Sequence, residues 1–175
     1  MLATTADDIK RLREETSCGV IDCKKALEAA LGDFNKAKDL LRKRGLEMAA
    51  KKSDRLAKEG RVESYIHNGN KMGVVVEVNC ETDFVARNED FCKFTKDLAM
   101  HIAATNPKYI KKDDVPADVL AKEPDQEAFI KANCLLAQAY VREPGKSIQD
   151  LLNELVAKIG ENIIVGRFVR YKVGE

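Results

Sequence analysis

The sequence predicts an α+β fold, in which a bundle of three helices precedes a core with a small antiparallel three-stranded sheet and packed helices. Two patterns predict this order. Apolar residues recur at helical spacing through residues 5–45, whereas residues 62–80 alternate between apolar and polar around a turn sequence. A second alternating stretch, residues 163–173, follows further helical segments and can add a third strand. We therefore expect helices to pack on one side of the sheet.

The first two helices of the expected bundle are separated by a short break. Thr5-Ala-Asp-Asp8 has the form of a helix start, in which a hydroxyl and a carboxylate cap each other's backbone amides. Ser17-Cys18-Gly19 breaks the first helix, and Gly32 ends the second. The apolar stripe of the second helix consists of Cys23, Leu27, Ala30 and Leu31.

The third helix is expected to begin at Asp33, as its N-cap, and to stop at Gly45. Three short helices cannot each bury an apolar stripe alone, so residues 1–45 should pack together as one bundle. Residues 46–60 are rich in Lys and Ala and predict a helical connector, which leads into a core of residues 61–175.

The core is expected to open with a hairpin. Residues 62–67 and 72–80 alternate as strands, and Asn68-Gly69 supplies the residues that a tight type I′ turn requires. A helix with one apolar face follows, and a further helix is expected over roughly residues 126–140. The apolar face of the first of these helices consists of Phe91, Phe94, Leu98 and Ile102.

A last helix and a last strand complete the expected core. Ser147 is in position to cap a helix that carries an apolar stripe as far as Ile159, and Gly160 is expected to end it. Residues 163–173 are rich in β-branched and aromatic residues and alternate, so they predict the third strand.

Composition excludes several classes of function. With 45% hydrophobic and 34% charged residues among 175, the chain should be globular with a densely charged surface. Its 30 basic and 29 acidic residues give a net charge of +1, which argues against a large nucleic-acid footprint. No run approaches the ~20 apolar residues that span a membrane, and the start lacks the pattern of a secretory signal. We expect a cytoplasmic protein.

The cysteines indicate the same compartment. The chain has five of them, an odd number, and none forms a C-x-x-C pair. All lie in or beside apolar-periodic segments, which predicts buried free thiols in a reducing cytosol. They are Cys18, Cys23, Cys80, Cys92 and Cys134.

No catalytic or metal centre emerges from the residues. The chain has no glycine-rich phosphate loop, and its two histidines, His67 and His101, lie in separate elements, too few for a zinc site or a triad. Cys80 with a distant histidine lacks a third, orienting group. We therefore expect a binding protein rather than an enzyme, with no cofactor.

One junction in the core is unusual. Asp83 and Phe84 lie between the strand that ends at Cys80 and the helix that follows, where no aromatic is needed to form the turn. Phe84 could pack into the core while Asp83 caps the helix. Alternatively, the pair could project outward, the ring supplying buried area in a partner and the carboxylate a charge, because aromatic anchors dominate interfaces.

The same stretch resembles a known family. Cys80-Glu-Thr-Asp-Phe-Val85 is similar to the N-C-x-T-D-F-V signature of translation elongation factor Ts. Leu12-Arg13 with Thr16 and Asp22-Cys-Lys-Lys-Ala-Leu27 resembles the amino-terminal motif of that family, and Lys158-Ile-Gly-Glu-Asn-Ile163 resembles a third motif. The matches keep the family order and cover essentially the whole chain, as in a short form with a single core module.

The resemblance implies a fold and a partner. It implies an amino-terminal bundle of the ubiquitin-associated type, a dimerisation-type core, and guanine nucleotide exchange on the GTPase elongation factor Tu. By similarity, one set of residues inserts into the GTPase and dislodges its Mg²⁺: Thr82, Asp83, Phe84 and Val85. A second set docks the bundle on the same partner: Lys10, Arg13, Val20 and Ile21.

One departure from the family sequence and one alternative function stand beside this reading. Where the family often has Gly-Ala-Gly-Met-Met, the chain has Ser-Cys-Gly-Val-Ile at residues 17–21, so its docking contacts would differ. A bundle of this type is also a common binding module, and the chain could be a non-catalytic adaptor that holds another protein through it.

The resemblance and the last strand together predict a homodimer. Larger family members carry a duplicated core, whereas this chain has one. The strand at residues 163–169 has apolar side chains on both faces, so a sheet covered on one side would leave the other to be buried, and a two-fold partner is the commonest solution. In the alternative, a helix around Leu135 covers that face and the chain is a monomer.

Overall fold

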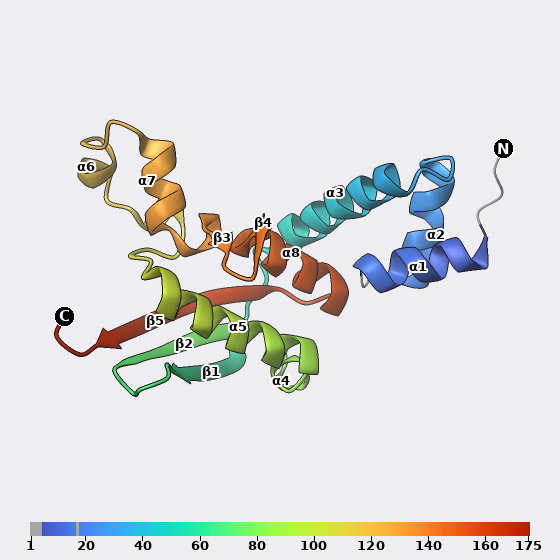
Figure 1. The fold of residues 1–175 in the computed structure, drawn as a ribbon. Helices are drawn as coiled ribbons and strands as arrows, with labels where there is room; N and C mark the ends of the chain where they lie inside the picture. Colours follow the sequence, from blue (N-terminus) through green and yellow to red (C-terminus); the bar gives the residue numbers. More distant parts are fainter. Residues whose placement is uncertain (1–4, 17) are drawn as a thin grey trace. The chain divides into compact units, whose positions relative to one another are not determined.

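The computed structural model describes residues 5–16 and 18–175. The chain divides into two compact units, Met1–Asp54 with Asn153–Glu161 and Arg55–Leu152 with Asn162–Glu175. Figure 1 shows the elements of both units, whose fold is α+β as predicted. Within the described part of the chain, no helix is both long and apolar enough to cross a membrane.

The first unit contains the predicted helical bundle. Its helices are α1 (Ala6–Thr16), α2 (Val20–Ala29) and α3 (Phe34–Lys52). Each contributes to one buried apolar cluster, so none has to bury its stripe alone. The buried members are Leu12, Cys23, Ala26, Leu27, Ala30, Ala37 and Leu41.

The helix starts confirm the capping predictions. The Asp8 amide donates to Thr5 Oγ1 at 3.2 Å, and the Thr5 amide donates to Asp8 Oδ2 at 3.1 Å. Asp33 Oδ1 accepts from the amides of Asn35 and Lys36, both at 3.0 Å. Hydrogen bonds from Thr5 and from the Lys36 amide hold the pKa of Asp8 and of Asp33, respectively, below the usual range. Ser17, in the predicted break, lies outside the described residues.

Two predictions about this unit were wrong. The third helix does not stop at Gly45 but continues to Lys52. Gly45 is buried where α3 meets the end of α8 (Ile148–Ile159), since a Cβ there would lie 3.5 Å from the Ala157 Cβ. Leu31 is exposed rather than part of the stripe, because its left-handed backbone, φ 54°, turns the chain after α2.

Substitution of Gly45 by alanine is expected to raise the free energy of unfolding by about 0.5–1 kcal/mol, the usual penalty of glycine inside a helix. The space allows it, because the new methyl group would make an ordinary contact with Ala157. Urea unfolding of the full chain measures the change. Gly69→Ala is the matched control and should destabilise, since Gly69 has open space but a φ of +86°. A lower stability of Gly45→Ala would show that α3 and the end of α8 approach more closely than this.

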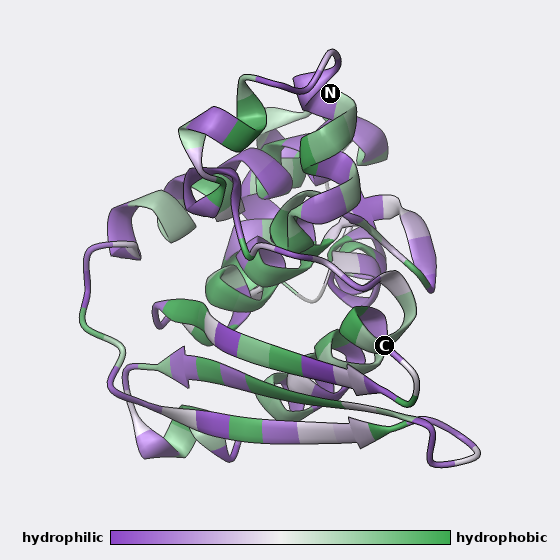
Figure 2. Ribbon diagram, turned by 90° about the vertical axis from the view of Figure 1, so that its left-hand side faces the viewer, coloured by the Kyte–Doolittle hydropathy of each residue, from purple (hydrophilic) through white to green (hydrophobic). Residues whose placement is uncertain are grey.

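The second unit is built on the predicted three-stranded antiparallel sheet. Its strands are β1 (Glu59–Ile66), β2 (Met72–Cys80) and β5 (Ile163–Lys172), and β2 lies between the other two. Hydrophobic and hydrophilic bands alternate along them, as Figure 2 shows. The inner face of β2 is buried, and α5 (Glu89–Thr105) packs over β1 and β2 with its predicted apolar face buried. The inner residues of β2 are Val74, Val76, Val78 and Cys80.

The hairpin between β1 and β2 differs from the prediction. A type I′ turn needs a positive φ at both Asn68 and Gly69, whereas the left-handed residues are Gly69 and Asn70, with φ of 86° and 56°. The His67 amide donates to the Met72 carbonyl at 2.9 Å across the loop. The loop is therefore longer than two residues.

The helix predicted over residues 126–140 is also shorter than expected. α7 (Gln126–Asn133) ends before Cys134, whose backbone is extended, and a 3-10 turn (Leu135–Ala137) follows. The Leu135 amide donates to the Tyr109 carbonyl at 2.9 Å, and both Cys134 and Leu135 are buried. Burial of these two side chains against a preceding segment thus outweighs the helical pattern.

The remaining elements surround this segment. β3 (Ala139–Tyr140) pairs with β4 (Glu143–Ser147), and a 3-10 turn (Lys112–Asp114) and α6 (Ala117–Leu120) precede α7. Ser147 caps α8 as predicted, its Oγ accepting from the Asp150 amide at 3.1 Å.

A buried histidine connects α5 to the segment after α7. His101 Nε2 lies 3.0 Å from Gln138 Oε1, which also accepts from Thr105 Oγ1 at 2.9 Å. The Gln138 amide nitrogen donates to the Ala132 carbonyl, so its Oε1 is the acceptor and His101 carries its proton on Nε2. His101 Nδ1 has no hydrogen-bond partner among the described residues. Burial lowers the pKa of His101, and the bond to Gln138 offsets this only in part.

The free energy of unfolding is therefore expected to fall as the pH drops below about 6.5, by on the order of 1 kcal/mol per pH unit at most. Between the ordinary histidine pKa and the lowered native one, the unfolded chain binds more protons than the native chain. Above that window His101 is neutral in both states and contributes no pH dependence.

Urea unfolding of His101→Gln at pH 5 and pH 7 tests this, because glutamine can donate to Gln138 but does not titrate. The variant should lose part of the pH dependence of the parent, whereas His67→Gln, at an exposed histidine, should keep it. An unchanged pH dependence in His101→Gln would contradict the assignment.

Candidate functional site

The strand β2 leads directly into the segment of interest. Two residues after β2 ends, Thr82 caps α4 (Asp83–Ala86), its Oγ1 accepting from the Val85 amide at 3.4 Å. The buried Cys80 thiol donates to the Thr82 carbonyl at 3.1 Å. A single helical turn is thereby attached to the end of the central strand before Asn88 caps α5.

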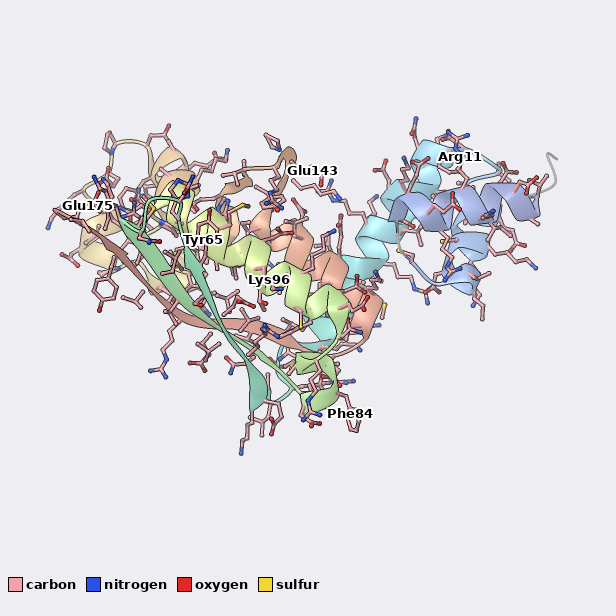
Figure 3. The ribbon with its side chains drawn as sticks, turned by 60° about the horizontal axis from the view of Figure 1, so that its bottom comes forward. Arg11, Tyr65, Phe84, Lys96, Glu143 and Glu175 are labelled. Atoms are coloured by element: carbon pink, nitrogen blue, oxygen red, sulfur yellow. The ribbon has the colours of Figure 1, made fainter. Side chains whose placement is uncertain are left out.

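Phe84 projects from this turn into solvent. Its side chain is 81% exposed, and Figure 3 shows the ring pointing away from the sheet and α5. Asp83 Oδ2 lies 2.9 Å from Arg87 in an exposed ion pair. The alternative in which Phe84 enters the core and Asp83 caps the helix was wrong, because Thr82 is the cap. Aromatic rings are enriched among the residues that anchor protein interfaces.

The second predicted set lies in the other unit. Lys10 and Arg13 are exposed and three positions apart on α1, so they share one face of that helix. Val20 and Ile21 are both exposed at the start of α2. Exposed basic and apolar side chains are therefore both present at the surface of this unit. Leu31 adds an exposed apolar side chain that the sequence pattern placed in the core.

The sheet has a third exposed feature, which we call the open sheet face. It is the face opposite α5, where exposed apolar residues of all three strands lie beside an ion pair between Glu77 and Arg167, and Val75 is paired to Val169. Phe168 and Val165 point to the opposite, inner side, so β5 is apolar on both faces as predicted. The apolar members of the open sheet face are Val62, Ile66, Val75, Ile164, Val169 and Tyr171.

The described residues contain no group of three or more side chains placed to hold a metal ion. His67 lies in the hairpin beside Tyr65, whose hydroxyl is 3.0 Å from His67 Nδ1, while His101 is a buried residue of α5. Cys80 hydrogen-bonds to a backbone carbonyl rather than to a histidine.

The five cysteines are all free. Cys23, Cys80 and Cys134 are buried as predicted, whereas Cys18 and Cys92 are half-buried. Burial raises the pKa of the Cys23 and Cys134 thiols, so their reactive thiolate forms are disfavoured.

Comparison with known proteins identifies the family. Residues 8–128 match the family model described as elongation factor TS. The chain is 50% identical to elongation factor Ts of Caldanaerobacter subterraneus subsp. tengcongensis, over 98% of this chain and 97% of that protein. It is 50% identical to elongation factor Ts of Thermodesulfovibrio yellowstonii, over 99% and 98%, and 47% identical to that of Desulfotalea psychrophila, over 99% and 100%. Since the similarity extends across nearly the whole of both chains, this chain belongs to the elongation factor Ts family.

Proposed function

We propose that the chain is a guanine nucleotide exchange factor for translation elongation factor Tu. The observation that carries the proposal is the exposed Phe84, which stands on a fixed helical turn within the segment that resembles the family signature. Membership of the elongation factor Ts family supports it.

The mechanism follows from what holds GDP in such a GTPase. Backbone amides and a lysine surround the phosphates, and Mg²⁺ connects phosphate oxygens to the protein. Phe84 would enter the partner as a wedge, since burial of an aromatic ring is among the largest single contributions to an interface. Displacement of the loop that positions the ion, together with the nearby Asp83 carboxylate, would dislodge Mg²⁺ and loosen GDP. Thr82 and Val85 hold the turn that presents both side chains.

Exchange of this kind needs no bond-making residue in the factor. The factor has to bind the nucleotide-free partner more tightly than the GDP-bound partner, and by linkage GDP then weakens its grip by the same ratio. Each tenfold difference corresponds to ~1.4 kcal/mol. The factor shifts no equilibrium between GDP and GTP, so the excess of GTP sets the direction.

The two other surfaces have separate parts in the proposal. Lys10, Arg13, Val20 and Ile21 dock the bundle on the partner through exposed basic and apolar side chains. The open sheet face pairs with a second copy of the chain, because an apolar sheet face exposed to water favours burial against an identical one. The working species would then be a cytoplasmic homodimer.

Phe84→Ala is expected to change the free energy of unfolding by less than about 0.5 kcal/mol, as for other exposed positions. It should nevertheless slow GDP release from elongation factor Tu by at least about tenfold, because the wedge is lost. Release of fluorescent GDP from the purified GTPase, with each variant added, measures this. Leu56→Ala, which truncates a similarly exposed apolar side chain at 75%, is the control.

A normal release rate with Phe84→Ala would overturn the wedge. Binding of the parent protein to the partner without faster GDP release would instead favour the adaptor. Asp83→Asn separates the charge from the ring: its effect should depend on the Mg²⁺ concentration, and indifference to Mg²⁺ would remove the carboxylate from the mechanism.

Val75→Glu is expected to convert the homodimer to monomers, since it places a charge on the open sheet face. Light scattering across a dilution series measures the mass. Val141→Glu is the matched control, because Val141 and Val75 are 41% and 42% exposed and Val141 lies outside this sheet. A monomer mass for the parent at every concentration, with full exchange activity, would end the homodimer proposal.

A further inference from the structure

Glu81 is the single residue between the end of β2 and the Thr82 cap of α4. Its Oε1 accepts from the backbone amide of Asn162 at 2.6 Å, and the Arg55 guanidinium lies 3.6 Å from the same oxygen. A carboxylate that accepts from a backbone amide makes a charge-assisted bond, which is among the stronger hydrogen bonds in proteins. The Glu81 side chain thus attaches the start of α4 to the rest of the unit, in addition to the backbone connection to β2.

Asn162 extends this attachment to a third segment. It precedes β5 and is buried, and its Nδ2 donates to the Arg55 carbonyl at 2.7 Å. Residues from three distant parts of the sequence therefore meet at the root of α4. We call Arg55, Glu81 and Asn162 the root cluster.

The turn that carries Phe84 needs such an attachment. A helix of four residues has no stability of its own, because its nucleation cost is not recovered over one turn. With its ring 81% exposed, Phe84 gains little packing that could fix its direction. The direction of the ring is consequently set by the backbone that the root cluster holds.

We propose that Glu81 and Asn162 are positioning residues for nucleotide exchange. The root cluster fixes the orientation of the Phe84 ring, so that insertion of the ring displaces part of the partner instead of bending α4. The inference rests on the proposed exchange function. A reacting group displaced by about 1 Å can lose on the order of a hundredfold in rate. By the same reasoning, a Phe84 ring whose position is not fixed by the root cluster would displace the partner less effectively and release GDP more slowly.

Glu81→Ala is expected to lower the rate of GDP release at saturating factor by roughly ten- to hundredfold. Glu81→Gln should restore most of the rate, since its amide oxygen can still accept from the Asn162 amide. Asp97→Ala is the matched control, because Asp97 is 22% exposed against 23% for Glu81 and is likewise paired with an arginine, at 2.8 Å. It should keep the parent rate.

A double-mutant cycle distinguishes positioning from general destabilisation. If Glu81 acts through Phe84, then Glu81→Ala should cost little further rate in the Phe84→Ala background. Asn162→Ala, which removes the bond to the Arg55 carbonyl, should give a smaller loss of the same non-additive kind. It also provides the measurement if Glu81→Ala does not fold by circular dichroism.

The outcomes separate the two proposals. A normal rate with Phe84→Ala alone would overturn the exchange wedge itself. A slow Phe84→Ala with a normal Glu81→Ala would overturn only the positioning role, as would losses that multiply in the double variant. If Glu81→Gln did not recover the rate, Glu81 would contribute through its charge and not through the hydrogen bond that positions α4.

Discussion

The burial of the inner face of β2 under α5 is the constraint on which the second unit depends. β2 lies between β1 and β5 and is paired with both, so its position fixes the two outer strands together. The same strand ends at Cys80, whose side chain is buried in the core while its thiol donates to the Thr82 carbonyl. Packing inside the sheet therefore determines where an exposed segment begins. The core beneath this surface segment therefore sets its position.

Local chemistry explains what the sequence could predict. A period-two pattern and a period of 3.6 residues are properties of neighbouring residues, so the strands, α5 and α8 could be predicted with little knowledge of their surroundings. Capping at Thr5, Asp33 and Ser147 depends on atoms within three residues of one another, and the structure confirms all three. The signature from Cys80 to Val85 was visible in the same way.

The features that the sequence could not predict depend on contacts between segments that are far apart in the chain. Gly45 has the composition of a helix end, but only the presence of α8 explains why a small residue lies within a continuing helix. Cys134 interrupts a good helical pattern because a segment more than twenty residues earlier offers hydrogen bonds and burial. The sequence alone likewise could not decide whether the Phe84 ring is buried or exposed, since the local pattern is compatible with either orientation. The root cluster left no motif, because its members are separated by 81 and 107 residues.

The last strand contains one residue without a counterpart on its neighbour. Glu77 pairs with Arg167 and Val78 with Val165, so Gly166 is the extra residue of a bulge, and a Cβ there would lie 2.6 Å from Asn79 Oδ1. Before Gly166, the odd-numbered residues of β5 face the inner side of the sheet, and after Gly166 the even-numbered residues do. A regular strand that ran through Gly166 without the bulge would exchange the two rows beyond it, turning Phe168 outward and Tyr171 inward. The bulge at this glycine thus determines which of the two aromatic rings, Phe168 or Tyr171, the sheet exposes to solvent.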